Sequence, residues 1–215
     1  MSSDLFVKVL DRAGNREYYG GDQEWFEKKT GKDYGCGVIA LTNVIITHDI
    51  ATNRLNPGID KVDKTRYMQV AESIRKKFLP IIPKVGISGL ELAIGANMYF
   101  LKNGINAIAR WGVRPDKLWT SVDKMLKDNW PVILAIGPNN LVFGKKTLDL
   151  KGDTYKSTAR AHYVTITAAD EETITVSSWG KRYTIPKAKY EHYMKRTSNP
   201  LFSNILFINQ RVKDM

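Results

Sequence analysis

The chain has 215 residues, of which 43% are apolar and 26% charged, a balance typical of a single globular domain and not of a disordered or fibrous protein. Its 33 lysines and arginines outnumber the 22 acidic residues and give a formal charge of +11, which bears on solubility and partners, not on fold. No run reaches the roughly 18 consecutive apolar residues that a membrane span requires, so we expect no spanning helix.

The basic residues are spread over the whole length instead of being gathered in one stripe. They occur as Lys28-Lys29, Arg75-Lys76-Lys77, Lys145-Lys146, Lys181-Arg182 and Lys195-Arg196. Because nucleic-acid binders more often concentrate such residues, we expect no nucleic-acid partner. The pattern favours a generic solvated surface over an anionic partner, and it is silent on oligomeric state.

Cys36 is the single cysteine, so an internal disulfide is excluded and a reducing compartment is the natural interpretation. Asp4, Lys8 and Asp11 interrupt the segment in which a secretory signal would place its apolar core. Both observations predict a cytoplasmic protein.

The three histidines, His48, His162 and His192, show no close-spaced pattern of metal ligands. We therefore expect neither a metal nor another cofactor. His48 ends an apolar run and is predicted to interact with a helix dipole, whereas His192 is predicted to be solvated.

The first fifty residues predict short extended and loop segments followed by a central helix. An extended segment over 5–20 leads to the loop 20–26, whose two glycines allow unusual backbone angles, and to a polar stretch, 27–33. The run Val38–Ile46 is apolar at nearly every position. Its β-branched residues favour a strand and its length favours a helix, and we interpret it as a helix enclosed by the rest of the domain.

Helical periodicity returns three times before residue 128, with one short strand between. Ser88 is the predicted cap of the second of these helices, because Glu91 completes a capping box. Asp116 or Thr120 is the predicted cap of the third. The elements are the helices Asp63–Phe78, Ser88–Lys102 and Leu118–Lys127 and the strand Ala107–Trp111.

After Asp128 the pattern changes to strands. The segment Gly137–Thr147 has the wrong glycine spacing for a phosphate loop and is predicted as a loop near the mouth of a cleft. Helices followed by an antiparallel sheet predict an α+β fold. We expect one domain, 1–215, with a helical part at about 20–130 and a sheet part at about 131–215. The later elements are the strands Pro131–Ile136, His162–Thr167, Thr173–Ser177 and Lys181–Ile185, the helix Pro186–Lys195 and the strand Asn204–Asn209.

Cys36 stands where the central helix begins, between Gly35 and Gly37. Backbone N–H groups and the helix dipole at such a position stabilise a thiolate and lower the thiol pKa. The flanking glycines leave room for a substrate backbone. A lone cysteine is more often a small core residue, so the placement gains meaning only together with other groups.

His162 is the candidate base, at the start of a strand that follows the loop Lys151–Ala161. Ser177, at the end of the next strand, is predicted to accept a hydrogen bond from the imidazole, with Trp179 shielding the pair from water. Asp170 is the alternative carboxylate, expected at the far end of the hairpin.

These segments resemble papain-like cysteine peptidases, most of all the bacterial group that includes double-glycine leader peptidases. The resemblance implies a papain-like fold, with a helical lobe followed by an antiparallel sheet lobe, and a peptide or amide substrate. It implies a nucleophile–base pair of Cys36 and His162. The segments that carry it are Tyr34–Leu41, Pro131–Leu134, Ala161–Val164 and Ser177–Gly180.

The resemblance also implies an oxyanion hole, to which a glutamine upstream of the cysteine contributes. Gln23 is the only upstream glutamine and is assigned that role, beside the Cys36 backbone N–H. Substrate contacts are expected at the residues that flank the catalytic positions: Gly35, Gly37, Trp179 and Gly180.

One departure from the family leaves two functions open. Ser177 stands where the family has Asn or Asp, and a hydroxyl is a weaker acceptor. The first function is a thiol-dependent peptidase or amide hydrolase that works through an acyl-enzyme. The second is a catalytically weak or inactive papain-like scaffold that binds an anionic or peptide partner through its basic surface.

Overall fold

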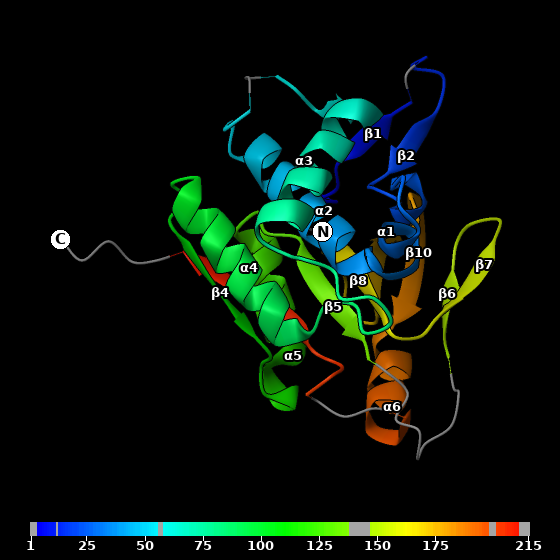
Figure 1. The fold of residues 1–215 in the computed structure, drawn as a ribbon. Coiled ribbons are helices and arrows are strands. Elements are labelled where there is room, and N and C mark those ends of the chain that lie inside the picture. Colours follow the sequence, from blue (N-terminus) through cyan, green and yellow to red (C-terminus); the bar gives the residue numbers. More distant parts are fainter. Residues whose placement is uncertain (1–3, 12, 56–57, 138–146, 198–200, 211–215) are drawn as a thin grey trace.

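Helix α2 (Cys36–Ala51) runs through the middle of the molecule, as its apolar run predicts (Figure 1). Every residue from Gly37 to His48 is buried, because the helix is enclosed by protein on all sides. The structure, a computed structural model, describes residues 4–11, 13–55, 58–137, 147–197 and 201–210.

The main sheet has eight strands in the order β4-β11-β5-β8-β9-β10-β6-β7, antiparallel at every pairing. With the helices it forms the predicted α+β fold. The bounds are β4 (Ala107–Trp111), β5 (Val132–Ile136), β6 (Leu148–Lys151), β7 (Lys156–Ala159), β8 (His162–Ala169), β9 (Thr173–Ser178), β10 (Lys181–Pro186) and β11 (Ile205–Gln210). The hairpin β6–β7 occupies most of the segment that we predicted as the loop before His162.

A second, small sheet lies near the start of the chain. Strand β1 (Lys8–Leu10) pairs antiparallel with β2 (Glu17–Tyr19) and parallel with β3 (Lys61–Asp63). Val7 and Val9 are fully buried, so the segment contributes to the core although its strands are only three residues long. The loop that follows β2 carries Gln23, and the sheet therefore fixes where that loop begins.

The remaining predicted helices are present: α3 (Lys64–Lys77), α4 (Gly89–Lys102), α5 (Leu118–Lys127) and α6 (Lys187–Thr197). The capping box of α4 is confirmed, with Ser88 and Glu91 bonded reciprocally. The predicted cap of α5 is wrong. Lys117 occupies that position without a side-chain bond, because a 3₁₀ turn, η2 (Pro115–Lys117), leads directly into the helix and Asp116 pairs with Arg114.

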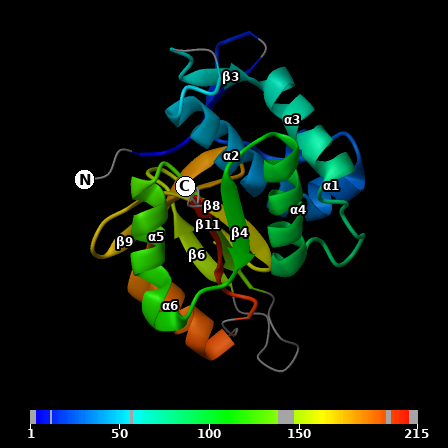
Figure 2. The same ribbon diagram turned by 90° about the vertical axis from the view of Figure 1, so that its left-hand side faces the viewer.

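The edge of the sheet at β4 is closed by a side chain of α4, which stands alongside it (Figure 2). Asn97 accepts a hydrogen bond from the Ala109 N–H and donates one to the Ala109 carbonyl, both at 2.8 Å. An amide side chain thus replaces a neighbouring strand at this point.

The predicted loop Gly137–Thr147 lies outside the described residues except at its two ends, so its place beside a cleft stays a prediction. In the described part of the chain, we find no helix with both the length and the apolar character of a membrane span.

Candidate active site

Cys36 is the first residue of α2, directly after the short helix α1 (Lys29–Tyr34), which the sequence analysis missed. Gly35 joins the two helices, and a Cβ there would collide with the Gly31 carbonyl and the Phe26 ring. Gly35 therefore serves helix packing, and its space is already filled by protein. A Cβ on Gly37 would stand 3.3 Å from the Tyr163 ring and 3.4 Å from the Ile87 side chain, so Gly37 is also in close contact with protein.

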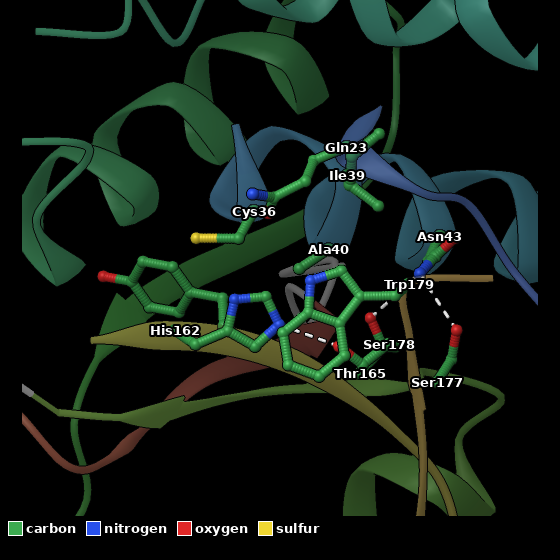
Figure 3. A pocket seen from close by; sticks show the side chains of 11 residues that line it. Gln23, Cys36, Ile39, Ala40, Asn43, His162, Thr165, Ser177, Ser178 and Trp179 are labelled. Carbon is green, nitrogen blue, oxygen red and sulfur yellow. Dashed lines mark hydrogen bonds between the residues drawn. The ribbon is translucent and has the colours of Figure 1, made fainter. Parts of the chain in front are cut away.

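His162 begins β8 and lines the same small cavity as Cys36 (Figure 3). Its Nε2 lies 2.7 Å from the Ser178 hydroxyl. The opposite edge of the ring, with Nδ1, is turned toward Cys36 in Figure 3. Both side chains are half-buried, so the pair is neither fully exposed nor sealed in the core.

The hydroxyl on the imidazole belongs to Ser178, and the prediction of Ser177 is wrong by one residue. Neighbouring residues of a strand point to opposite faces, so only one of the two faces the histidine. The Ser177 hydroxyl instead donates to the Tyr19 carbonyl at 2.6 Å, inside the molecule.

Trp179 and Gly180 form the two-residue turn between β9 and β10, and both have positive φ angles, of 48° and 66°. This is the turn type that matches strand twist, but a tryptophan is an unusual residue for its first position. The conformation lays the Trp179 indole on the His162 ring, with centroids 4.3 Å apart and planes 9° from parallel. Trp179 thus shields the imidazole, as predicted.

Gly180 holds the loop of Gln23 and does not line the described cavities beside Cys36. Its N–H donates to the Gly21 carbonyl and its carbonyl accepts from the Tyr19 N–H, at 2.9 and 3.0 Å. Its role as a substrate contact stays a prediction.

Gln23 lies in the turn η1 (Gln23–Trp25) and lines the cavity with Cys36. Its Nε2 donates to the Lys32 carbonyl at 2.5 Å, which anchors the amide. A primary amide nitrogen has two hydrogens, so one remains for a further acceptor. Its Oε1 is buried and has no partner among the described residues.

Burial sets the protonation states of the pair. It raises the pKa of the Cys36 thiol, although the backbone N–H groups of Tyr163, Gly37 and Cys36 itself offset part of the rise. Burial also lowers the pKa of His162 to about 4. The resting pair is therefore a neutral thiol beside a neutral imidazole, and the expectation of a lowered thiol pKa is wrong, because burial outweighs the helix terminus.

Two cavities meet at His162. The first, about 10 Å³, is the size of one water molecule and lies among Gln23, Cys36, His162 and Ser178. The second, about 500 Å³, is mostly apolar and lies between the start of α4, the end of β5 and the start of β8. Its lining includes Ile87, Leu90, Trp111, Ile136, Tyr163 and Phe202.

The other candidates have structural surroundings. The Asp170 carboxylate accepts from the N–H groups of Glu172 and Thr173 in the β8–β9 turn, the far end of the hairpin. His48 lies in the last turn of α2, as predicted, and is stacked on Trp130; burial lowers its pKa, which weakens the predicted interaction with the helix dipole. Among the described residues, no group of three side chains is placed to hold a metal ion.

Sequence reasoning missed two residues at the site. Tyr163 packs on Gly37 and donates from its hydroxyl to the Ile87 carbonyl, which joins β8 to the segment before α4. Asn43 lies two turns after Cys36 on α2 and binds three neighbouring segments. The only signal for Asn43 was a polar amide within an otherwise apolar run.

No family model matches the sequence, and no curated protein is found to be similar to it. A solved structure from Bacillus anthracis, described as a "putative C39-like peptidase", is similar: 17% of aligned residues are identical, and the match covers 89% of this chain and 94% of that chain. The TM-score is 0.49.

Proposed function

We propose that the chain is a cysteine peptidase or amide hydrolase in which Cys36 is the nucleophile and His162 the general base. The observation that carries this proposal is the common cavity of a helix-terminal thiol and an imidazole held by Ser178 and Trp179. The residues around this cavity include the three kinds of group that thiol catalysis uses: a nucleophile, a base and a group that orients the base.

Because the pair rests in its neutral form, proton transfer accompanies attack. The mechanism uses the tautomer with its proton on Nε2, which lies 2.7 Å from the Ser178 hydroxyl and donates to it, so that Nδ1 is left to take the thiol proton. The sulfur bonds to the substrate carbonyl carbon, and the imidazolium then protonates the leaving amine. Water hydrolyses the thioester with the same imidazole as base, which returns the thiol.

The negative oxygen of the tetrahedral intermediate needs donors that are already in place. The Cys36 backbone N–H and the second hydrogen of Gln23 Nε2 fill this role in the proposal. The anchoring of Gln23 on the Lys32 carbonyl supports it, because the amide needs little rearrangement when the charge develops.

The 500 Å³ cavity is the proposed site for an apolar part of the substrate. It shares His162 and Tyr163 with the reaction centre, and its size and apolar lining are typical of ligand sites. A substrate that places an apolar side chain there presents its neighbouring carbonyl to Cys36.

Acylation by p-nitrophenyl acetate tests the proposal without a known substrate. Attack by Cys36 releases p-nitrophenolate and leaves an acetyl group on sulfur, which digestion and mass spectrometry locate. We expect the folded protein to be acylated at least about tenfold faster than N-acetylcysteine at pH 7, because the free thiol lacks a general base. Cys36→Ala should abolish the initial rapid release of p-nitrophenolate (the burst).

A rate equal to or below that of N-acetylcysteine contradicts the proposal. In that case the favoured alternative is the scaffold without turnover, in which the basic surface binds an anionic or peptide partner. Salt then weakens the binding, and Cys36→Ala leaves it unchanged.

A further inference from the structure

We infer that Asn43 is a positioning residue for the oxyanion donor Gln23, a role that rests on the function proposed above. Asn43 does not touch the reacting atoms. Asn43 is 3% exposed. Its side chain extends from α2 to the loop after β2 and to the paired strands β8 and β9.

The acceptor side of the Asn43 amide holds the loop of Gln23. Its Oδ1 accepts from the Gly21 N–H at 2.9 Å and from the Tyr67 hydroxyl at 2.7 Å. Gly21 lies two residues before Gln23, so this bond fixes the approach of the loop to the start of α2.

The donor side of the same amide holds the sheet. Its Nδ2 donates to Thr165 at 3.2 Å and to Ser177 at 3.5 Å (Figure 3). These two residues face each other across β8 and β9, the strands that carry His162 and Ser178. The Ser177 hydroxyl then donates to the Tyr19 carbonyl and so returns to the loop of Gln23.

The glycines of this loop are required by the network. A Cβ on Gly20 would collide with the Ser177 hydroxyl, and one on Gly21 would collide with the Tyr67 ring. The backbone passes so close to Asn43 that a shift of the amide shifts the loop. A residue with both an acceptor and donors is needed at position 43, because the loop offers an N–H and the strands offer hydroxyl oxygens.

Two reactions of Cys36 separate positioning of Gln23 from general effects on the thiol. Acylation by p-nitrophenyl acetate forms an oxyanion, whereas alkylation by iodoacetamide displaces iodide from carbon and forms none. The ratio of the two rates therefore reports the oxyanion donors independently of thiol reactivity.

We expect Asn43→Leu to lower this ratio by about ten- to a hundredfold, the size of effect that a misplaced catalytic group produces. Asn43→Asp keeps the acceptor for Gly21 and Tyr67 and should fall between the wild type and Asn43→Leu. Ser177→Ala removes little volume and tests the network even if Asn43→Leu does not fold, with an expected fall of about two- to fivefold.

Thr42→Val is the matched control. Thr42 is equally buried on the same helix, but among the described residues its hydroxyl bonds to the Val38 carbonyl alone, within α2. We expect this variant to lower the unfolding temperature and to leave the ratio unchanged. An equal fall in Thr42→Val and in the Asn43 variants overturns the inference.

A double-mutant cycle with Gln23→Ala tests whether Asn43 acts through Gln23. Once Gln23 is removed, Asn43→Leu should produce no further fall in the ratio, and Asn43→Asp takes its place in the cycle if the leucine variant does not fold. Additive falls overturn the inference while Cys36-dependent acylation of the wild type still supports the proposed function. A wild type that is not acylated faster than N-acetylcysteine contradicts the proposed function itself.

Discussion

Two histidines of this chain are stacked on tryptophans with planes 9° from parallel, and they lie toward opposite ends of α2. His48 and Trp130 have ring centroids 3.5 Å apart, and His162 and Trp179 have centroids 4.3 Å apart. Burial lowers the pKa of both imidazoles. Stacking and a lowered pKa therefore do not by themselves distinguish a reactive histidine from a structural one.

The two histidines differ in the partners of their ring nitrogens. His48 donates from Nδ1 to the Asn129 backbone carbonyl, and both it and Trp130 are buried in the core. His162 bonds to the Ser178 hydroxyl through Nε2, and its other edge faces a thiol and a cavity. An imidazole with one nitrogen oriented and the other next to an open space is the arrangement that base catalysis needs.

The largest expected effect separates the two histidines by activity. His162→Gln should lower the rate of Cys36 acylation by about 10²–10⁴, because the general base is lost. His48→Gln should leave that rate within about threefold and lower the unfolding temperature, since it disturbs core packing and the bond to Asn129 but not the cavity at Cys36. The p-nitrophenolate burst and thermal unfolding measure the two quantities, and equal rate losses in both variants contradict the distinction.

The tryptophans should differ in the opposite sense, by stability. Trp130 is 1% exposed, so Trp130→Ala should lower the free energy of unfolding by about 3–5 kcal/mol. Trp179 is half-buried in a surface turn, and we expect Trp179→Ala to cost less than about 2 kcal/mol. Urea titration of both variants checks the order, which a larger loss at Trp179 would reverse.

The smallest expected effect is a shared sensitivity to acid. The pKa of a histidine in the unfolded chain is near 6.5, whereas in the folded chain burial lowers the pKa of His162 to about 4 and also lowers the pKa of His48. The unfolded state therefore takes up more protons between these pH values, and stability falls as the pH falls through this window.

His162→Gln and His48→Gln should each flatten the fall of the unfolding temperature between pH 6.5 and pH 4. His192→Gln is the control for loss of a histidine, because its ring is exposed to solvent. A slope that none of the three substitutions changes would assign the acid sensitivity to other groups.

Much of the fold was predictable because its long elements carry redundant signals. The helix at Gly89–Lys102 has a capping box, helical spacing and, directly after it, the pair Asn103-Gly104, which favours a helix end; the three signals agree. The short strands β1, β2, β3, β6 and β7 have three or four residues each, too few for an alternating pattern to stand out.

The candidate site was predictable in its residue types but not in its fine geometry. The choice between Ser177 and Ser178 depends on where the turn after β9 begins. The sequence does not indicate a turn at Trp179, because tryptophan is not a typical residue for a positive φ. The sign of the Cys36 pKa shift depends on burial, which only the packing of the whole chain determines. Asn43 is a polar residue in a mostly apolar run, and nothing in that run indicates that its side chain binds other segments.

Because of Asn97, the two edges of the main sheet differ in how easily a strand of another polypeptide can pair with them. The Asn97 amide already occupies both backbone groups of Ala109, so an incoming chain at β4 must first displace α4. At the opposite edge of the sheet, β7 pairs only with β6 among the described residues. Main-chain pairing with a foreign strand is thereby disfavoured at the β4 edge, and of the two edges of this sheet β7 is the more open to it.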